Sequence, residues 1–135
     1  RHRCRAWRAR CRGRGESSTF NAVNQQDIVV NAARFTPIDL LASAYNSCML
    51  GTMDAVALQH GFSIGKATSE VEWALSTDGT RVGTMNVKIG FDQDLQEDQR
   101  ALVEHAAQKL CHVGQSLNPA IERHFQFTYQ VVVAA

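Results

Sequence analysis

Residues 36–61 read TPIDLLASAYNSCMLGTMDAVALQHG, and this stretch decides the fold. Thr36 is a suitable N-cap, and Pro37 suits the first helical position, where its missing N–H is not needed. Asp39 stands where the acid of a capping box reaches back to the cap. Gly61 is a typical helix stop, so we expect one long helix that ends just before it.

Apolar residues recur along this helix at the spacing of one face. They are Leu41, Ala44, Tyr45, Cys48 and Val56. Small residues between them allow a close neighbour, so we expect the helix to be mostly buried. Cys48 lies on this stripe and has two interpretations, a small buried hydrophobe or a reactive thiol.

Strand patterns lie on both sides of this helix. Residues 20–33 read as two short strands around a polar Asn-Gln-Gln-Asp turn. Residues 70–76 and 82–91 alternate in polarity around an Asp-Gly pair, which predicts an antiparallel hairpin with one face on a core. A last strand is expected over residues 124–133, where aromatic and polar residues alternate.

A second helix is expected before that last strand. Asp94 and Glu97 fit an N-terminal capping pair, and Gly114 fits the stop. Its apolar stripe consists of Leu95, Leu102, Val103, Ala106 and Leu110. The resulting order, ββ-α-ββ-α-β, indicates an α+β fold with a largely antiparallel sheet. The first of its two main helices is expected to be central and buried.

Charge is distributed unevenly over the 135 residues. Residues 1–15 hold seven arginines and no acid, whereas residues 16–135 hold seven basic residues and 13 acidic ones. We interpret residues 1–15 as an arm that is disordered or comes from a miscalled start, since the chain does not begin with Met. We interpret residues 16–135 as a single domain. Such an arm could bind nucleic acid, but this is not the partner we expect.

The cysteines and the hydropathy pattern limit the classes of protein to which this chain can belong. Four cysteines (Cys4, Cys11, Cys48 and Cys111) are too few for a disulfide scaffold, and no CxxC pair suggests zinc. We therefore expect a reducing, cytoplasmic location. No apolar run approaches the roughly 20 residues of a membrane span, and no secretory signal is expected. The thiols of Cys48 and Cys111 are 63 residues apart in sequence, so both a structural and a paired functional role stay open.

Two segments resemble the OsmC/Ohr family, the osmotically induced protein and the organic hydroperoxide resistance protein. FTPIDLLASAYNSCMLGTMDAVALQHGF, residues 35–62, resembles the family's Pro-acid-Leu-Leu helix start that leads to a cysteine on a buried helix. LCHVGQSLNP, residues 110–119, resembles its Cys-Pro-Val-x-x-(Ser/Thr)-Leu motif at the end of a second helix. The resemblance covers about residues 20–130, in order. It implies an intertwined homodimer with active sites at the subunit interface.

The resemblance also implies an activity, a thiol peroxidase that reduces organic hydroperoxides without a metal or bound organic cofactor. Cys48 matches the peroxidatic cysteine and Cys111 the resolving one. A Cys48 thiolate attacks the hydroperoxide and becomes a sulfenic acid, which condenses with Cys111 to a disulfide. An external dithiol, lipoyl-type or other, then reopens the disulfide by exchange.

The organic hydroperoxide branch of the family also uses an Arg to stabilise the thiolate and a Glu to position that Arg. Arg14, with Arg12 beside it, and Arg34 are the candidates for the Arg. Ile38 occupies the position of the Glu, ten residues before the peroxidatic cysteine. Asp39, one residue later, can be an Arg partner or a helix cap.

Two further departures from the family leave alternatives open. His112 replaces the family's Pro after the resolving cysteine, and it can support a thiolate or act as a cation at a helix C-terminus. A metal site of Cys111, His112 and His105 lacks the i,i+4 spacing usual for helical His pairs. Because the Glu is missing, a second function stays open. It is an OsmC-fold module that binds a small ligand or senses redox state without efficient peroxidase turnover, with Tyr45 and Met49 among the residues that could line its pocket.

Overall fold

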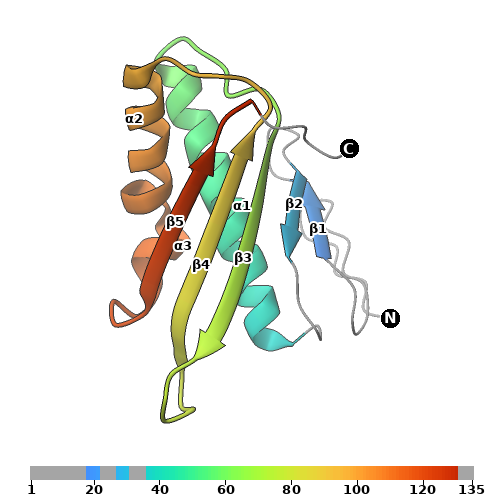
Figure 1. Cartoon of the computed structure of the whole chain (residues 1–135), viewed down its shortest axis with the longest axis vertical. Coiled ribbons are helices and arrows are strands. Elements are labelled where there is room, and N and C mark those ends of the chain that lie inside the picture. The colour runs from blue at the N-terminus through green and yellow to red at the C-terminus, as the bar shows by residue number, and fades with distance from the viewer. Residues whose placement is uncertain (1–17, 22–26, 31–35, 131–135) are drawn as a thin grey trace.

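The computed structural model describes residues 18–21, 27–30 and 36–130. Helices pack on one face of a three-stranded sheet, and a separate two-stranded hairpin lies beside it (Figure 1). The elements are β1 (Ser18–Asn21), β2 (Asp27–Val30), α1 (Pro37–Gln59), β3 (Ala67–Leu75), β4 (Val82–Phe91), α2 (Glu97–His105), the π-helical turn η1 (Ala106–Leu110), α3 (His112–Ser116) and β5 (Glu122–Thr128). The α+β class and the short N-terminal hairpin are confirmed. Residues 1–15 and Arg34 lie outside the described residues.

The start of α1 is the one that the sequence predicts. Thr36 Oγ1 accepts the Asp39 N–H at 3.3 Å, and Asp39 Oδ2 accepts the Thr36 N–H at 2.5 Å, which completes a capping box. The other Asp39 oxygen accepts the indole N–H of Trp73 at 2.8 Å and so ties the helix start to β3. Gly61, with φ of 77°, follows the C-terminal end, where glycine tolerates the left-handed conformation.

The buried face of α1 differs from the predicted stripe. Leu41 is 38% exposed and Ala44 is also exposed. The apolar residues of α1 that are fully buried are Ala42, Tyr45, Met49, Leu50, Met53 and Ala57. Apolar or small residues occur on nearly every side of this helix, so spacing alone does not single out the face that packs on the sheet.

The sheet has the strand order β3-β4-β5 and packs one face on the helices. β3 and β4 are antiparallel across a turn at Gly79, whereas β4 and β5 are parallel. The sheet is therefore mixed, because the chain crosses over through α2, η1 and α3 before β5 begins. β5 begins at Glu122, two residues before the predicted strand. The largest core residues of the sheet are Val71, Met85, Val87, Ile89 and Phe91.

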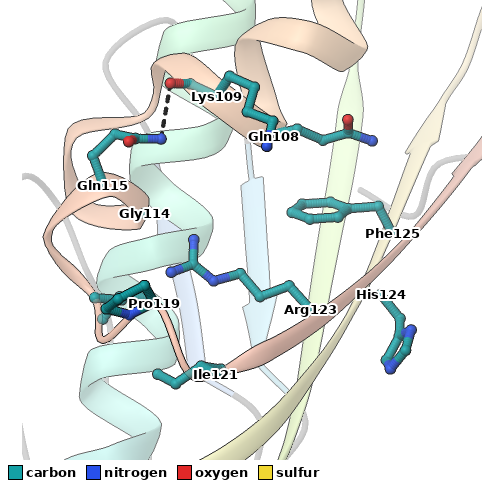
Figure 2. Close-up of a pocket in the computed structure, with 10 residues that line it drawn as sticks. Gln108, Lys109, Gly114, Gln115, Pro119, Ile121, Arg123, His124 and Phe125 are labelled. Carbon is teal, nitrogen blue, oxygen red and sulfur yellow. Dashed lines mark hydrogen bonds between the residues drawn. The ribbon is translucent and has the colours of Figure 1, made fainter.

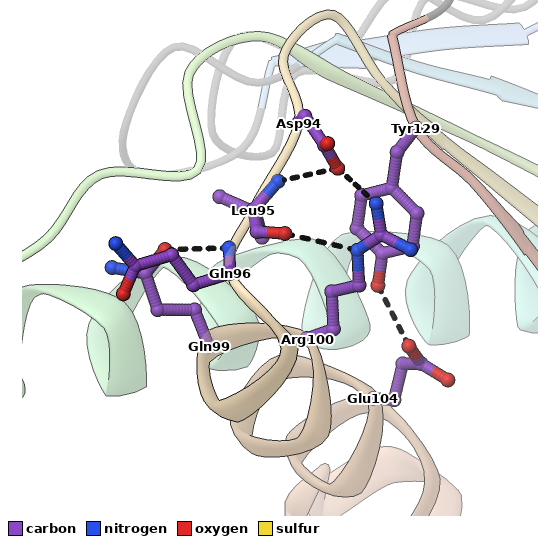
Figure 3. Close-up of polar contacts among 7 residues, drawn as sticks. All are labelled: Asp94, Leu95, Gln96, Gln99, Arg100, Glu104 and Tyr129. Atoms are coloured by element: carbon purple, nitrogen blue, oxygen red, sulfur yellow. Dashed lines mark hydrogen bonds and ion pairs between the residues drawn. The ribbon is translucent and has the colours of Figure 1, made fainter.

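The second helix begins later than predicted. Its N-cap is Gln96, whose N–H donates to Gln99 Oε1 at 3.0 Å, so the expected capping pair of Asp94 and Glu97 is wrong. Asp94 instead accepts the Leu95 N–H at 2.9 Å and forms an ion pair with Arg100 (Figure 3).

This helix also does not run on regularly to the expected stop. It widens into the π-helical turn η1, and the chain is extended at Cys111 before α3 starts. The wider turn changes which residues face the core. Leu110 is consequently 45% exposed, and Gly114 lies buried inside α3 instead of ending a helix.

A cluster of Asp94, Arg100, Glu104 and Tyr129, here called the Tyr129 cluster, fastens α2 to the end of β5 (Figure 3). The Tyr129 ring stacks on Phe91 with centroids 4.9 Å apart, and the Arg100 guanidinium lies 4.2 Å from the Tyr129 ring. The Tyr129 hydroxyl donates to Glu104 Oε2 at 2.7 Å.

A helix must be both long and apolar to cross a bilayer, and no helix in the described part of the chain meets both conditions.

Candidate active site

Two free thiols from different helices lie close to each other, near enough for the side chain of Cys48 to act on Cys111 as a hydrogen-bonding neighbour. Cys48 lies in the middle of α1 and is partly buried, and Cys111 at the start of α3 is 1% exposed. Burial, and next the hydrogen-bonding side chain of Cys48, raise the pKa of the Cys111 thiol to about 12. The fold therefore brings together two cysteines that are 63 residues apart in sequence.

The irregular backbone before α3 explains how Cys111 reaches the core. Cys111 has φ of −70° and ψ of 120°, so it acts as the extended N-cap of α3. Its sulfur accepts the Gly114 N–H at 3.4 Å, as the oxygen of a Ser cap would. This bond lowers the pKa of Cys111, but by less than burial and Cys48 raise it.

Tyr45 lies beside both thiols. It precedes Cys48 by three residues on α1, so the two side chains share a helix face, and Tyr45 is fully buried. Burial raises the pKa of Tyr45, the nearby Arg123 guanidinium opposes this, and Cys111 and Cys48 raise it further. Gly114 packs against the ring, since a Cβ atom on Gly114 would lie 2.9 Å from Tyr45 Cε1.

Arg123 contributes a cation from the inner face of β5. Its Cζ lies 5.5 Å from the centroid of the Tyr45 ring. One of its terminal nitrogens would lie 3.4 Å from a Cβ on Gly114, so the guanidinium sits next to the α3 backbone. Figure 2 shows Arg123 reaching from β5 toward Gly114, whereas His124 turns the other way.

An open pocket of about 640 Å³ adjoins Arg123 between β5 and the segment of η1 and α3 (Figure 2). Its lining residues are Gln108, Lys109, Gly114, Gln115, Leu117, Pro119, Ile121, Arg123, His124 and Phe125. The lining combines apolar side chains with Lys109 and Arg123 and includes no Asp or Glu. It thus offers positive charge and apolar surface next to the thiol site.

The other residues that the sequence singled out are placed differently. Arg14 and Arg34 lie outside the described residues. Asp39 caps α1 and bonds Trp73, and no guanidinium of the described chain is bonded to it. In the described ranges, no three His, Cys, Asp or Glu side chains gather as metal ligands would, and this covers Cys111, His105 and His112.

Arg123 was not predicted from the sequence, although the alternation of β5 contains the signal. Phe125 and Phe127 are partly buried, and the residues between and beside them are exposed. Alternate residues of a strand share a face, so Arg123, two residues before Phe125, lies on the same inward face. An arginine on the core side of a strand is unusual unless it has a partner or a function.

Comparisons with known proteins identify the family of the chain. The family profile described as OsmC-like protein matches residues 30–124, which is more than half of the chain. The chain belongs to the OsmC-like protein family. No curated protein sequence matches it.

Solved structures of OsmC-like proteins share the fold. The chain is 26% identical to a putative osmotic stress induced and detoxification response protein from Psychrobacter arcticus, with a TM-score of 0.64 over 82% of this chain and 85% of that one. It is 20% identical to an OsmC-like protein from Mycoplasma pneumoniae, with a TM-score of 0.61 over 84% and 88%. It is 17% identical to the organic hydroperoxide resistance protein OhrB of Bacillus subtilis, with a TM-score of 0.57 over 88% and 96%.

Proposed function

We propose that this OsmC-like protein is a thiol peroxidase that reduces organic hydroperoxides, with Cys48 as the nucleophile and Cys111 as the resolving cysteine. The observation that carries the proposal is the closeness of a partly exposed thiol to a buried one. Similar folds in proteins described as organic hydroperoxide resistance proteins give further support.

The reaction runs in two steps. The Cys48 thiolate attacks the terminal oxygen of ROOH, so that an S–O bond forms, the O–O bond breaks and RO⁻ leaves to become the alcohol. The Cys48 sulfenic acid then loses its hydroxyl as water when the Cys111 sulfur attacks it and the disulfide forms. Two thiols are oxidised and one hydroperoxide is reduced, and an external dithiol of lipoyl or other type restores the thiols by exchange.

Arg123 supplies the positive charge in this proposal. A thiolate, and not a thiol, is the reactive species, and neighbouring cations favour it. Arg123 is held next to Tyr45 and Gly114, both of which contact the thiol site. It can therefore act where the family uses an arginine from the N-terminal region, and it does not need the glutamate that Ile38 replaces.

We also propose that the working form is a cytoplasmic homodimer. Leu40 and Leu41 at the start of α1 are 40% and 38% exposed, which leaves apolar surface near the site for a second copy to cover. Light scattering tests the dimer, and a monomer at micromolar concentration would contradict it.

The enzymatic proposal is tested with the reduced protein and cumene hydroperoxide in single turnover. We expect two thiols to be lost per chain, and mass spectrometry to show a disulfide between Cys48 and Cys111. Cys48→Ser should abolish the fast phase. Cys111→Ser should keep the first oxidation but stop at a sulfenic acid, which a dimedone adduct reveals.

A ligand-binding or redox-sensing module remains the second candidate, because the pocket beside Arg123 joins apolar walls to positive charge. Slow thiol loss that is unchanged in Cys48→Ser, together with saturable binding of a small carboxylate in the pocket, would favour this alternative.

A further inference from the structure

We propose that the Tyr45 hydroxyl is a catalytic proton donor and acceptor, which protonates the leaving alkoxide in the first step and then takes the proton of the Cys111 thiol in the second. This inference deepens the proposed function and rests on it.

The first observation is the unsatisfied state of the hydroxyl. Tyr45 is fully buried, and among the described residues only its hydroxyl and the Asn46 side-chain nitrogen are buried polar atoms without a hydrogen-bond partner. Arg123 approaches the hydroxyl oxygen as a hydrogen-bond donor and lowers the pKa of Tyr45, but not in the geometry of a formed hydrogen bond, and no described residue accepts the proton of the hydroxyl. A buried polar group without a partner is destabilising, so a phenylalanine would be at least as stable at this position. An unpaired buried hydroxyl in a native structure needs an explanation, and a hydrogen bond from the Tyr45 hydroxyl to a bound substrate would provide one.

The second observation is position. Tyr45 and Cys48 are three residues apart on α1 and share a face, and Gly114, whose N–H bonds the Cys111 sulfur, contacts the Tyr45 ring. The charges of both thiols act on the Tyr45 hydroxyl. The Tyr45 side chain is therefore close to both thiols, and in the proposal its hydroxyl reaches the oxygen atoms of a hydroperoxide that Cys48 attacks. The Gly114 position leaves no room for a side chain that would displace the ring.

The third observation is a chemical need. The Cys111 thiol, with a pKa raised to about 12, gives almost no thiolate at neutral pH and requires a base. An alkoxide leaving group requires an acid in the preceding step. Burial raises the pKa of Tyr45, so the hydroxyl keeps its proton until the alkoxide forms, and the tyrosinate produced is a strong base beside Cys111.

The proton balance closes over one turnover. In the first step the Cys48 thiolate takes the terminal OH of ROOH, RO⁻ takes the Tyr45 proton, and ROH and tyrosinate result. In the second step tyrosinate takes the Cys111 proton, the Cys111 thiolate attacks the sulfenic sulfur, and hydroxide leaves and is protonated by solvent. Tyr45 returns to its starting state, and the electron pair given up by the two sulfurs has reduced the O–O bond.

The test compares Tyr45→Phe with wild type against two oxidants in rapid-reaction experiments on the fully reduced protein. tert-Butyl hydroperoxide expels a strongly basic alkoxide, whereas peracetic acid expels acetate, which needs no proton. We expect Tyr45→Phe to slow sulfenic acid formation by tert-butyl hydroperoxide about a hundredfold, in the range typical of general acid catalysis. We expect the rate with peracetic acid to stay nearly the same. Tyr129→Phe is the matched control, because the chain has two tyrosines and the other hydroxyl is bonded to Glu104, away from the thiols.

The second role is read from the following phase. At tert-butyl hydroperoxide concentrations high enough for the sulfenic acid to accumulate, disulfide formation in Tyr45→Phe should be slower than in wild type, where the first step has left a tyrosinate. In the variant it should speed up as the pH rises toward the pKa of Cys111. The same experiments in Cys111→Ser separate the two roles, since only the first step remains there.

The outcomes separate this inference from the proposed function. Equal slowing with both oxidants, or no slowing with tert-butyl hydroperoxide, overturns the role of Tyr45 while the peroxidase stands. If wild-type Cys48 is not oxidised rapidly by either reagent, the peroxidase proposal itself fails.

Discussion

Two tyrosine–arginine pairs occupy the two ends of β5, and they are built in opposite ways. In the Tyr129 cluster each of the four side chains has a polar partner, because the hydroxyl donates to Glu104 and the Arg100 guanidinium pairs with Asp94 while it covers the ring (Figure 3). At the thiol site Tyr45 is more deeply buried, yet its hydroxyl has no partner in the described structure.

The contrast separates a region whose polar groups stabilise the fold from one that leaves a buried hydroxyl unsatisfied. Polar groups satisfied within the chain hold α2 on β5. In the proposed peroxidase, the unpartnered Tyr45 hydroxyl beside Cys48 and Cys111 is available to bond a substrate. Strained or unsatisfied groups tend to collect at functional sites, and this pair of regions follows that rule.

The largest expected difference concerns the two arginines. Arg123→Gln should slow the oxidation of Cys48 by cumene hydroperoxide about a hundredfold, as expected when a preorganised charge is removed from a reacting centre. Arg100→Gln should leave this rate nearly unchanged, because Arg100 serves the Tyr129 cluster. Stopped-flow fluorescence at neutral pH measures both. Equal rates for the two variants would remove Arg123 from the site, and Arg123→Lys should recover part of the loss.

A second comparison uses two glycines. Gly114→Ala places a methyl group 2.9 Å from Tyr45 Cε1 in a packed core, so we expect a loss of about 1–3 kcal/mol in the free energy of unfolding. Gly51→Ala meets no atom within 4 Å inside α1 and should gain about 0.5–1 kcal/mol from helix propensity. Urea unfolding measures both values. A neutral Gly114→Ala would show that the ring of Tyr45 is not held against α3.

Some of the features behind these expectations could be predicted from the sequence, and others could not. The start of α1 was predicted correctly because its signals are local: Thr36, Pro37 and Asp39 act within one turn. The buried face of α1 was predicted in part only, since it is chosen by a sheet that forms from distant segments. The π-helical turn before Cys111 carries no recognised sequence signal, and it decides which way that thiol faces.

The thiol site shows the same division between local and distant information. The resemblance to the OsmC/Ohr family pointed to Cys48 and Cys111, but neither composition nor spacing could show that their side chains meet. Arg123 comes from the last strand and lies 75 residues after Cys48 in the sequence. Only the fold brings it near Tyr45.

A third prediction concerns the pH dependence of stability. The pKa of Cys111 is raised in the folded state to about 12, from 9.0 without the fold, so the unfolded chain releases this proton first as the pH rises. The resulting stabilisation is complete below pH 9.0 and is lost as the pH rises toward 12. Between pH 8 and pH 10, wild type should lose about 1.4 kcal/mol more than Cys111→Ala in the free energy of unfolding. Parallel curves for the two proteins would contradict a buried, protonated Cys111.

The smallest expected effect is the most direct comparison of the two hydroxyls. Tyr129→Phe leaves Glu104 without its donor and should cost about 1 kcal/mol in the free energy of unfolding. Tyr45→Phe removes a hydroxyl that has no partner in the described structure, so it should leave stability unchanged or slightly higher. Urea unfolding of the reduced proteins measures stability, and peroxidase rates on the same samples measure activity, so the two variants can be compared in both. Tyr129→Phe should be less stable but fully active, and Tyr45→Phe should be stable but slow. If Tyr45→Phe were the less stable of the two, its hydroxyl would have a structural partner, and its availability to a substrate would be refuted.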